Sequence, residues 1–244
     1  GRVLIGHSSS IDQNAKVQAS TTSTDTFAGF KYGANNAPNI IRLGKSRNAS
    51  VGSNTILQDD DEIGRINFVG ADGTDFNDCA SIQCFVDGTP SDGTDMPGRL
   101  ELRTSADGSA TPTTRLTIDS AGVVNVPDNG KFTAGASSDL SIYHDGTNSH
   151  INNTTGYIVV GTDSYAVKDQ SLNEFYIKAL KDGGVELYYD NVLKLNTESA
   201  GTRIQGQLIL PNTSGVSLSI KDGGKAVFGN SDDLQIYHDG SDSY

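Results

Sequence analysis

The stretch "DLSIYHDGTNSHI", residues 139–151, decides the fold of this chain. Nearly the same letters return as "DLQIYHDGSDSY" at residues 233–244. In each copy apolar and polar residues alternate up to an Asp-Gly pair, which is typical of a β-strand that enters a hairpin turn. The stretch therefore predicts a β-hairpin that the chain uses twice.

A two-residue turn at Asp145-Gly146 predicts the register of the first hairpin. Ile142 would face Ser149, and Leu140 would face Ile151. Because strand side chains alternate between the two faces, one face is expected to be apolar, with Leu140, Ile142 and Ile151. The other face is expected to be polar, with Ser141, Tyr143, Asn148 and His150. A lone hairpin is marginal in water, so further strands or a partner chain are needed.

The same period-two alternation recurs along the chain. It occurs at residues 62–70 (EIGRINFVG), 99–104 (RLELRT), 115–119 (RLTID) and 206–210 (GQLIL). A second hairpin is expected at residues 185–195 (VELYYDNVLKL), around Asp190-Asn191. Asp-Gly, which suits tight hairpin turns, occurs eight times. We therefore predict an all-β fold of short antiparallel hairpins and meanders.

The repeated stretch is longer than the hairpin itself. Residues 131–150 align without gaps on residues 225–244 at an offset of 94, and 11 of the 20 positions are identical. Such self-similarity predicts a linear array of units. We expect a β-rich module at 1–127, a complete hairpin module at 128–221 and the start of a further copy at 222–244.

Composition and charge limit the possible partners. The net charge is −12 with 18 basic and 30 acidic residues, which argues against nucleic-acid binding. No apolar run is long enough to span a membrane, so no membrane insertion is expected. Only 35% of residues are hydrophobic and Trp is absent. Thin apolar faces are better buried when three chains share one core, so this content favours an elongated, intertwined homotrimer.

These stretches resemble modules of the long tail fibres of marine and cyanobacterial tailed phages. The resemblance rests on residues 139–151, 183–195 (GGVELYYDNVLKL) and 233–244. For residues 1–127 it rests on "GRVLIGHSSS" at 1–10, "RLGKSR" at 42–47, "EIGRINFVGADGTDF" at 62–76, "VDGTP" at 86–90 and the stretch from 95 to 122 that ends in "RLTIDSAG". It implies a homotrimeric virion component, made in the cytoplasm of the host bacterium, that contacts other tail or baseplate proteins. We expect a shaft or spacer that supports host adsorption.

Two other functions remain open at this point. A receptor-binding module would hold host cell-surface polysaccharide through exposed tyrosines, for which the candidates are Tyr143, Tyr188, Tyr189 and Tyr237. A polysaccharide depolymerase would need two suitably spaced carboxylates, one with a raised pKa. No hydrolase motif occurs, so a non-enzymatic protein without catalytic residues is expected.

No metal or other cofactor is expected. His144, His150 and His238 could meet on a trimer axis, but no His-x-His pattern occurs. The acidic run at 59–62 (DDDE) lacks the spacing of a calcium loop and is expected to be a solvated turn. Cys79 and Cys84 are expected to be buried free thiols.

Overall fold

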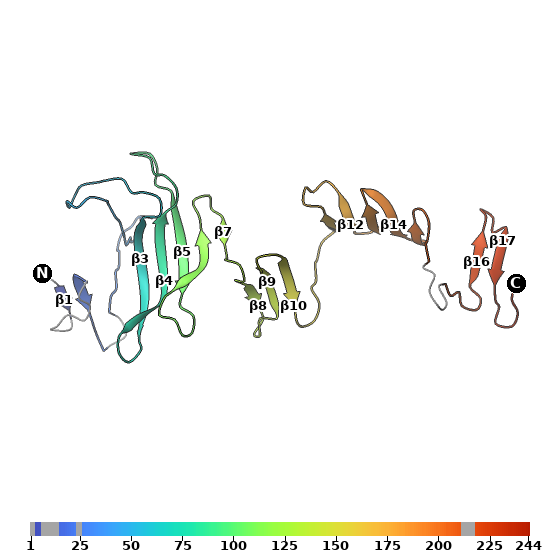
Figure 1. Cartoon of the computed structure of the whole chain (residues 1–244), viewed down its shortest axis with the longest axis horizontal. Helices are drawn as coiled ribbons and strands as arrows, with labels where there is room; N and C mark the ends of the chain where they lie inside the picture. Colours follow the sequence, from blue (N-terminus) through green and yellow to red (C-terminus); the bar gives the residue numbers. More distant parts are fainter. Residues whose placement is uncertain (1–2, 6–14, 23–25, 211–217) are drawn as a thin grey trace. The chain divides into compact units, whose positions relative to one another are not determined.

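The computed structural model describes residues 3–5, 15–22, 26–210 and 218–244 (Figure 1). Throughout these ranges the regular elements are β-strands, which confirms the predicted all-β class. No helix in the described ranges could therefore cross a membrane. Most of the stretch at 1–10 lies outside the described residues. The chain divides into two units, Gly1–Gly156 and Tyr157–Tyr244. The three-module division expected from the sequence stays a prediction.

The described residues of the first unit form three sheets. A parallel pair joins β1 (Val3–Ile5) and β2 (Val17–Ala19). A five-stranded antiparallel meander contains β3 (Glu62–Ala71), β4 (Phe76–Val86), β5 (Gly98–Thr104), β6 (Thr113–Ile118) and β7 (Val124–Asn125). A three-stranded meander follows, with β8 (Phe132–Ala134), β9 (Leu140–His144) and β10 (Ser149–Asn153).

In the second unit, the part that the structure describes forms two antiparallel sheets. Five strands form the larger one: β11 (Ser164–Lys168), β12 (Phe175–Leu180), β13 (Val185–Tyr189), β14 (Val192–Glu198) and β15 (Gly201–Ile204). The smaller one pairs β16 (Lys225–Phe228) with β17 (Leu234–Tyr237). In every antiparallel sheet each strand pairs with its neighbours in sequence, as expected for meanders.

Most of the predicted strands are present. The stretches at 62–70, 99–104 and 115–119 lie on β3, β5 and β6. The hairpin around Asp190-Asn191 is also confirmed, because Tyr189 pairs with Val192 and both turn residues have positive φ (52° and 54°). The strand predicted at 206–210 is wrong, since these residues form no regular element.

The predicted register of the hairpin at 139–151 is also wrong. Ile142 pairs with Ile151, and the loop has four residues, 145–148. The Asp145 carboxylate accepts hydrogen bonds from the backbone N–H groups of Thr147 (2.8 Å) and Asn148 (2.7 Å), and the Asp145 N–H donates to the Asn148 carbonyl (3.0 Å). The register moves by two residues, so the strand residues keep their predicted faces while Asn148 enters the loop.

The same four-residue loop closes two other hairpins. At residues 72–75 and 239–242 the first Asp again accepts from the backbone N–H groups two and three positions later. The glycine after this Asp has φ of 104° at Gly73, 94° at Gly146 and 103° at Gly240. Glycine adopts this backbone conformation without steric strain, which explains why Asp-Gly begins all three loops.

The cysteines depart from the expectation of burial. Phe68 pairs with Ala80 and Val69 pairs with Asp78, so Cys79 is the extra residue of a β-bulge. Its thiol is exposed and donates to the Phe68 carbonyl (3.0 Å). Cys84 is only partly buried. The bulge moves Cys79 out of the alternation, so its exposure could not be foreseen from spacing.

Few apolar side chains are buried in the described part of the chain. Leu57 and Val86 are the buried hydrophobic residues there, with 5% and 0% exposure. A globular chain of this length normally buries a large apolar core. The described sheets therefore leave most of their apolar surface uncovered.

Candidate assembly surface

One face of the β3–β7 sheet carries continuous rows of apolar side chains. Hydrogen-bonded pairing aligns Ile66, Ile82, Leu102 and Leu116 across four strands. The adjacent row aligns Cys84, Leu100, Ile118 and Val124. Cross-strand neighbours on one face lie close enough to contact each other, so the rows form one apolar surface.

The opposite face of this sheet is polar, and its charged side chains pair with one another. Glu101 accepts hydrogen bonds from Arg99 (2.8 Å), Arg103 (2.6 Å) and the Thr114 hydroxyl (2.9 Å). Burial alone would raise the pKa of Glu101, but these donors outweigh it and hold the pKa below its ordinary value. The guanidinium groups of Arg99 and Arg103 also lie over the Phe85 ring, 4.6 and 5.4 Å from its centroid.

The solvent exposure of the two faces is the reverse of that expected for a sheet that folds alone in water. On the polar face Ser81, Gln83 and Glu101 are 3%, 5% and 6% exposed. On the apolar face Ile66 is 49% and Leu102 39% exposed. An antiparallel sheet normally packs its apolar face onto a core and leaves the polar face to solvent. Apart from the contact of Leu43 with Gly64 at one edge, the apolar rows of this sheet have no covering layer in the described chain.

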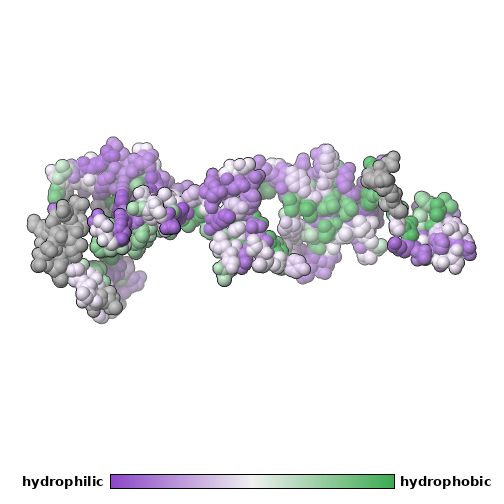
Figure 2. Space-filling model, turned by 60° about the horizontal axis from the view of Figure 1, so that its bottom comes forward, coloured by the Kyte–Doolittle hydropathy of each residue, from purple (hydrophilic) through white to green (hydrophobic). Residues whose placement is uncertain are grey.

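The β11–β15 sheet repeats this arrangement in the second unit. One row crosses all five strands: Val167, Ile177, Leu187, Leu195 and Ile204. The other face carries the ion pair between Lys178 and Glu186 (3.1 Å). Ile177, Leu187 and Ile204 are 37%, 39% and 41% exposed, and Figure 2 shows hydrophobic surface over these strands.

The two smaller antiparallel sheets also have one apolar face each. Phe132, Ile142 and Ile151 form a row across β8, β9 and β10 and are about half exposed or more. In the β16–β17 hairpin Phe228 pairs with Leu234, and both side chains are more than half exposed. We call the apolar faces of the four antiparallel sheets the assembly surface.

Nothing in the described strands covers the assembly surface. Strands contact only strands of their own sheet. Exposed side chains of these faces, such as Ile66 (49%), Phe132 (56%) and Leu234 (56%), are therefore covered by no strand of another sheet in the described chain.

The polar faces of the two equivalent hairpins carry the same stack of side chains. The Tyr143 ring lies between the Lys131 ammonium, 4.3 Å from its centroid, and the His150 ring at 4.7 Å. His150 in turn contacts Asp145 (2.7 Å). Ninety-four residues later, Lys225 lies 4.4 Å from the Tyr237 ring, Tyr244 stacks on it at 4.8 Å, and the Tyr244 hydroxyl donates to Asp239 (3.2 Å).

Backbone geometry also matches between positions that are 94 apart. Gly135 and Gly229 both have φ of 92°, and Ser138 and Asp232 have φ of 55° and 56°. At each glycine an added Cβ would overlap the carboxylate of Asp139 or Asp233. The turn before each hairpin therefore requires glycine for two reasons, its positive φ and the close carboxylate.

The four tyrosines predicted to contact glycan differ in their surroundings. Tyr143 and Tyr237 each lie between a lysine and a second ring, so both ring faces are occupied. The Tyr188 ring lies 5.7 Å from the Phe175 ring, and its hydroxyl donates to Glu186 (2.6 Å). Tyr189 is 74% exposed. Their role in glycan binding stays a prediction.

The acidic run at 59–62 forms a turn, but it is less solvated than expected. Asp61 is 9% exposed and accepts hydrogen bonds from Lys45 (2.9 Å) and Arg47 (2.5 Å). The Arg47 guanidinium, the Gln58 N–H and Lys45 hold the pKa of Asp61 well below its ordinary value. Asp60 pairs with Arg99 (2.8 Å). The described residues contain no cluster of three or more His, Cys, Asp or Glu suited to a metal ion.

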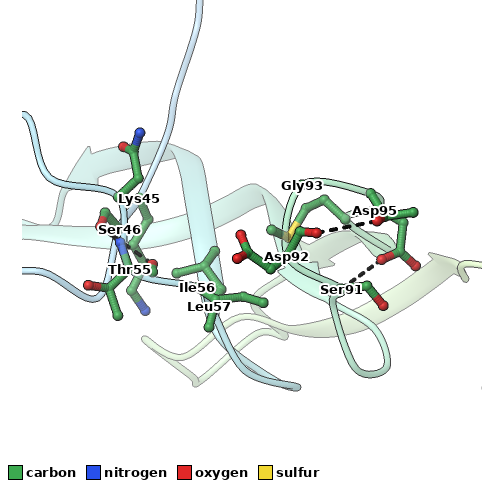
Figure 3. Close-up of a pocket in the computed structure, with 12 residues that line it drawn as sticks. Lys45, Ser46, Thr55, Ile56, Leu57, Ser91, Asp92, Gly93 and Asp95 are labelled. Atoms are coloured by element: carbon green, nitrogen blue, oxygen red, sulfur yellow. Dashed lines mark hydrogen bonds between the residues drawn. The ribbon is translucent and has the colours of Figure 1, made fainter.

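An open cleft of about 470 Å³ lies between residues 45–57 and the turn at 91–96 (Figure 3). Ile56 and Leu57 line one side, and Asp92 and Asp95 lie on the other (Figure 3). Two of its charged groups are engaged within the chain: Lys45 pairs with Asp61, and Asp95 accepts from the Ser91 N–H (2.7 Å). The cleft therefore shows no convergent set of free polar groups for a ligand.

Sequence reasoning missed the Arg99–Glu101–Arg103 network. Its signal was present in "RLELR" at 99–103, where charges of alternating sign occupy every second position. Alternation places all three on one strand face, where neighbours of opposite charge pair. The pattern identifies the face of β5 on which the charged side chains pair with one another within the chain.

No protein-family model matches the chain. No curated protein matches it either. Among solved structures, the chain is similar to the carboxy-terminal domain of the bacteriophage T5 L-shaped tail fibre with its intra-molecular chaperone domain. The identity is 9%, the TM-score is 0.45, and the match covers 84% of this chain and 69% of that chain. A similarity of this size carries no argument about function.

Proposed function

We propose that this chain is a non-enzymatic structural part of a bacteriophage tail fibre, a shaft or spacer that supports host adsorption. In this proposal three copies assemble as a homotrimer in the virion. The assembly surface supports it most directly: four successive antiparallel sheets each leave one apolar face uncovered. The resemblance of the sequence to phage tail fibres is the basis for the proposed family and for the proposed number of three chains.

Charge distribution gives the assembly its orientation. The chain carries a net charge of −12, so contacts between copies are favoured where charge is absent. The apolar rows contain no charged residue, whereas the polar faces carry ion pairs such as Glu101 with Arg103 (2.6 Å). In the assembly the apolar faces point inward and the polar faces point outward.

A spacer function fits the recurring hairpin geometry. Units with the same local structure extend reach when they are copied, because each unit needs only its neighbours for stability. The fibre would then act by geometry, placing distal contacts at the host surface. Several fibres on one virion multiply weak contacts through effective concentration.

A receptor-binding role is a second candidate, supported by Tyr189. Its ring is 74% exposed at the tip of the β13–β14 hairpin, and the described residues place no other aromatic ring against it. An exposed aromatic ring is a suitable platform for host polysaccharide. Tyr143 and Tyr237 favour this role less, because side chains of the same chain flank both ring faces.

The mass in solution and the place in the virion test the proposal. Light scattering is expected to give about three times the chain mass of 25.7 kDa. A map of the intact virion should place the chain between the tail body and the host-contacting end. A stable monomer would contradict the assembly, and a terminal position with bound glycan would favour the receptor-binding role.

A further inference from the structure

Two connecting segments of the second unit are made of apolar residues. The first is residues 157–160 (YIVV), before β11, and the second is residues 208–210 (LIL), after β15. Neither forms a strand with the described chain. Tyr157 and Val159 are 94% and 84% exposed, and Ile209 is 79% exposed.

The pattern of these connectors differs from that of the sheets. Alternating side chains of an extended segment point to opposite sides, so Tyr157 and Val159 would face one way and Ile158 and Val160 the other. Apolar residues on both sides are typical of a strand that is buried on both faces. A single sheet face or a flat ligand would cover only half of such a segment.

We propose that residues 157–160 and 208–210 each lie against the same residues of two further copies, as parallel segments in register. The inference rests on the homotrimer of the proposed function and identifies where the chains interlock. In a three-fold assembly, equivalent residues lie at the same height along the axis, so equivalent segments run parallel. The backbone N–H and C=O groups of each segment can then pair with those of its neighbours.

The local charge permits three copies to meet at these connectors. Residues 157–162 and 206–210 contain no charged side chain. The next charged residue, Asp163, has a partner in its own chain, Lys181 (3.7 Å). Three copies of a chain with net charge −12 therefore meet here without facing like charges.

The surface area also favours a second copy as the occupant. Both connectors and one face of each of the four antiparallel sheets are exposed in the described chain, which is more apolar surface than a partner of a single sheet face would cover. Copies of the same chain cover every uncovered sheet face and both connectors at once. A small partner would cover one of them.

Cysteine cross-linking of the full chain tests this inference. In a Cys79→Ser/Cys84→Ala background, which keeps the apolar row free of a hydroxyl, Ile158→Cys, Val159→Cys and Ile209→Cys are oxidised and separated on a non-reducing gel. At least one of the first two, together with Ile209→Cys, is expected to give a cross-linked dimer. Its yield should approach about two thirds of the chain, because three equivalent thiols form one disulfide and leave one free.

The control is Ser241→Cys, which places the thiol in the exposed loop at 239–242 and is expected to stay uncross-linked. The mass of each variant is measured by light scattering before oxidation. A trimeric mass with no cross-link above the control overturns this inference and leaves the proposed function intact. A monomeric mass of the unsubstituted chain overturns the proposed homotrimer itself.

Discussion

The Tyr143 ring stacks on the His150 ring, with centroids 4.7 Å apart and 14° between the ring planes. Tyr237 and Tyr244 repeat this relationship at 4.8 Å and 15°. The second ring differs in identity, yet in both hairpins it also reaches the Asp that begins the loop. An aromatic ring with a polar edge is thus the common requirement at this position.

His150→Tyr is therefore expected to preserve the stability of the first hairpin, whereas His150→Ala is expected to lower it. The alanine variant loses the ring stack, which contributes about 0.5–1.5 kcal/mol. Urea denaturation at a fixed protein concentration measures both, since concentration affects the stability of an assembly. Equal losses for the two variants would show that the stack does not stabilise the hairpin.

Gly135→Ala and Gly229→Ala are each expected to destabilise the turn before their hairpin. Positive φ alone costs a non-glycine residue about 1–2 kcal/mol, and the new Cβ would also overlap Asp139 or Asp233. Gly44→Ala is the control, because its Cβ meets no atom within 4 Å. Thermal unfolding should separate the two turn variants from the control, and three equal midpoints would contradict the prediction.

Acidification is expected to weaken the hairpin loops. The Asn148 N–H, His150 and the Thr147 N–H hold the pKa of Asp145 well below its ordinary value. The folded state therefore favours the charged carboxylate, and this contribution is present above the ordinary Asp pKa of about 3.9 and is lost as pH falls below it.

The measurement is the urea midpoint from pH 7 down to pH 2. It is expected to hold steady to about pH 5 and then to fall. Asp145→Asn keeps an acceptor for the two backbone N–H groups but cannot titrate, so its decline at low pH should be shallower. An identical decline in both proteins would assign the acid sensitivity to other carboxylates, such as Asp61.

Leu187→Glu is expected to disrupt the assembly, because it places a charge in the apolar row of the β11–β15 sheet. Ala166→Glu is the matched control: it adds the same charge on the other face, where residue 166 pairs with Lys178. Sedimentation velocity should show lighter species for Leu187→Glu and an unchanged mass for Ala166→Glu. Loss of assembly in both would indicate that net charge, rather than the apolar face, controls association.

The sequence allowed the strands with clear alternation to be predicted, since β3, β5 and β6 lie where period two is strongest. It did not determine how those strands align. "DGTN" at 145–148 fits a two-residue turn as well as the four-residue loop that the Asp145 carboxylate closes. The bulge at Cys79 likewise depends on pairing with β3, which no local pattern reveals.

The assembly surface was predictable in kind and not in detail. Alternation indicated one apolar face on each hairpin, but the row from Val167 to Ile204 depends on four separate registers. Two of these contain irregularities, between Val167 and Lys168 and between Leu187 and Tyr188. The burial of Glu101 beneath Arg99 and Arg103 was not predicted either, because charged residues are usually expected to be exposed to solvent.

The meander order of the sheets has a consequence for folding kinetics. Within each antiparallel sheet the strands pair with their neighbours in sequence, so these pairings span short sequence distances. Low contact order favours fast formation of the individual sheets. In the proposed homotrimer, joining the apolar faces would need several chains, so the rate of this step would rise with protein concentration. Synthesis of neighbouring copies on one messenger RNA would raise the local concentration at the time when the apolar faces are uncovered.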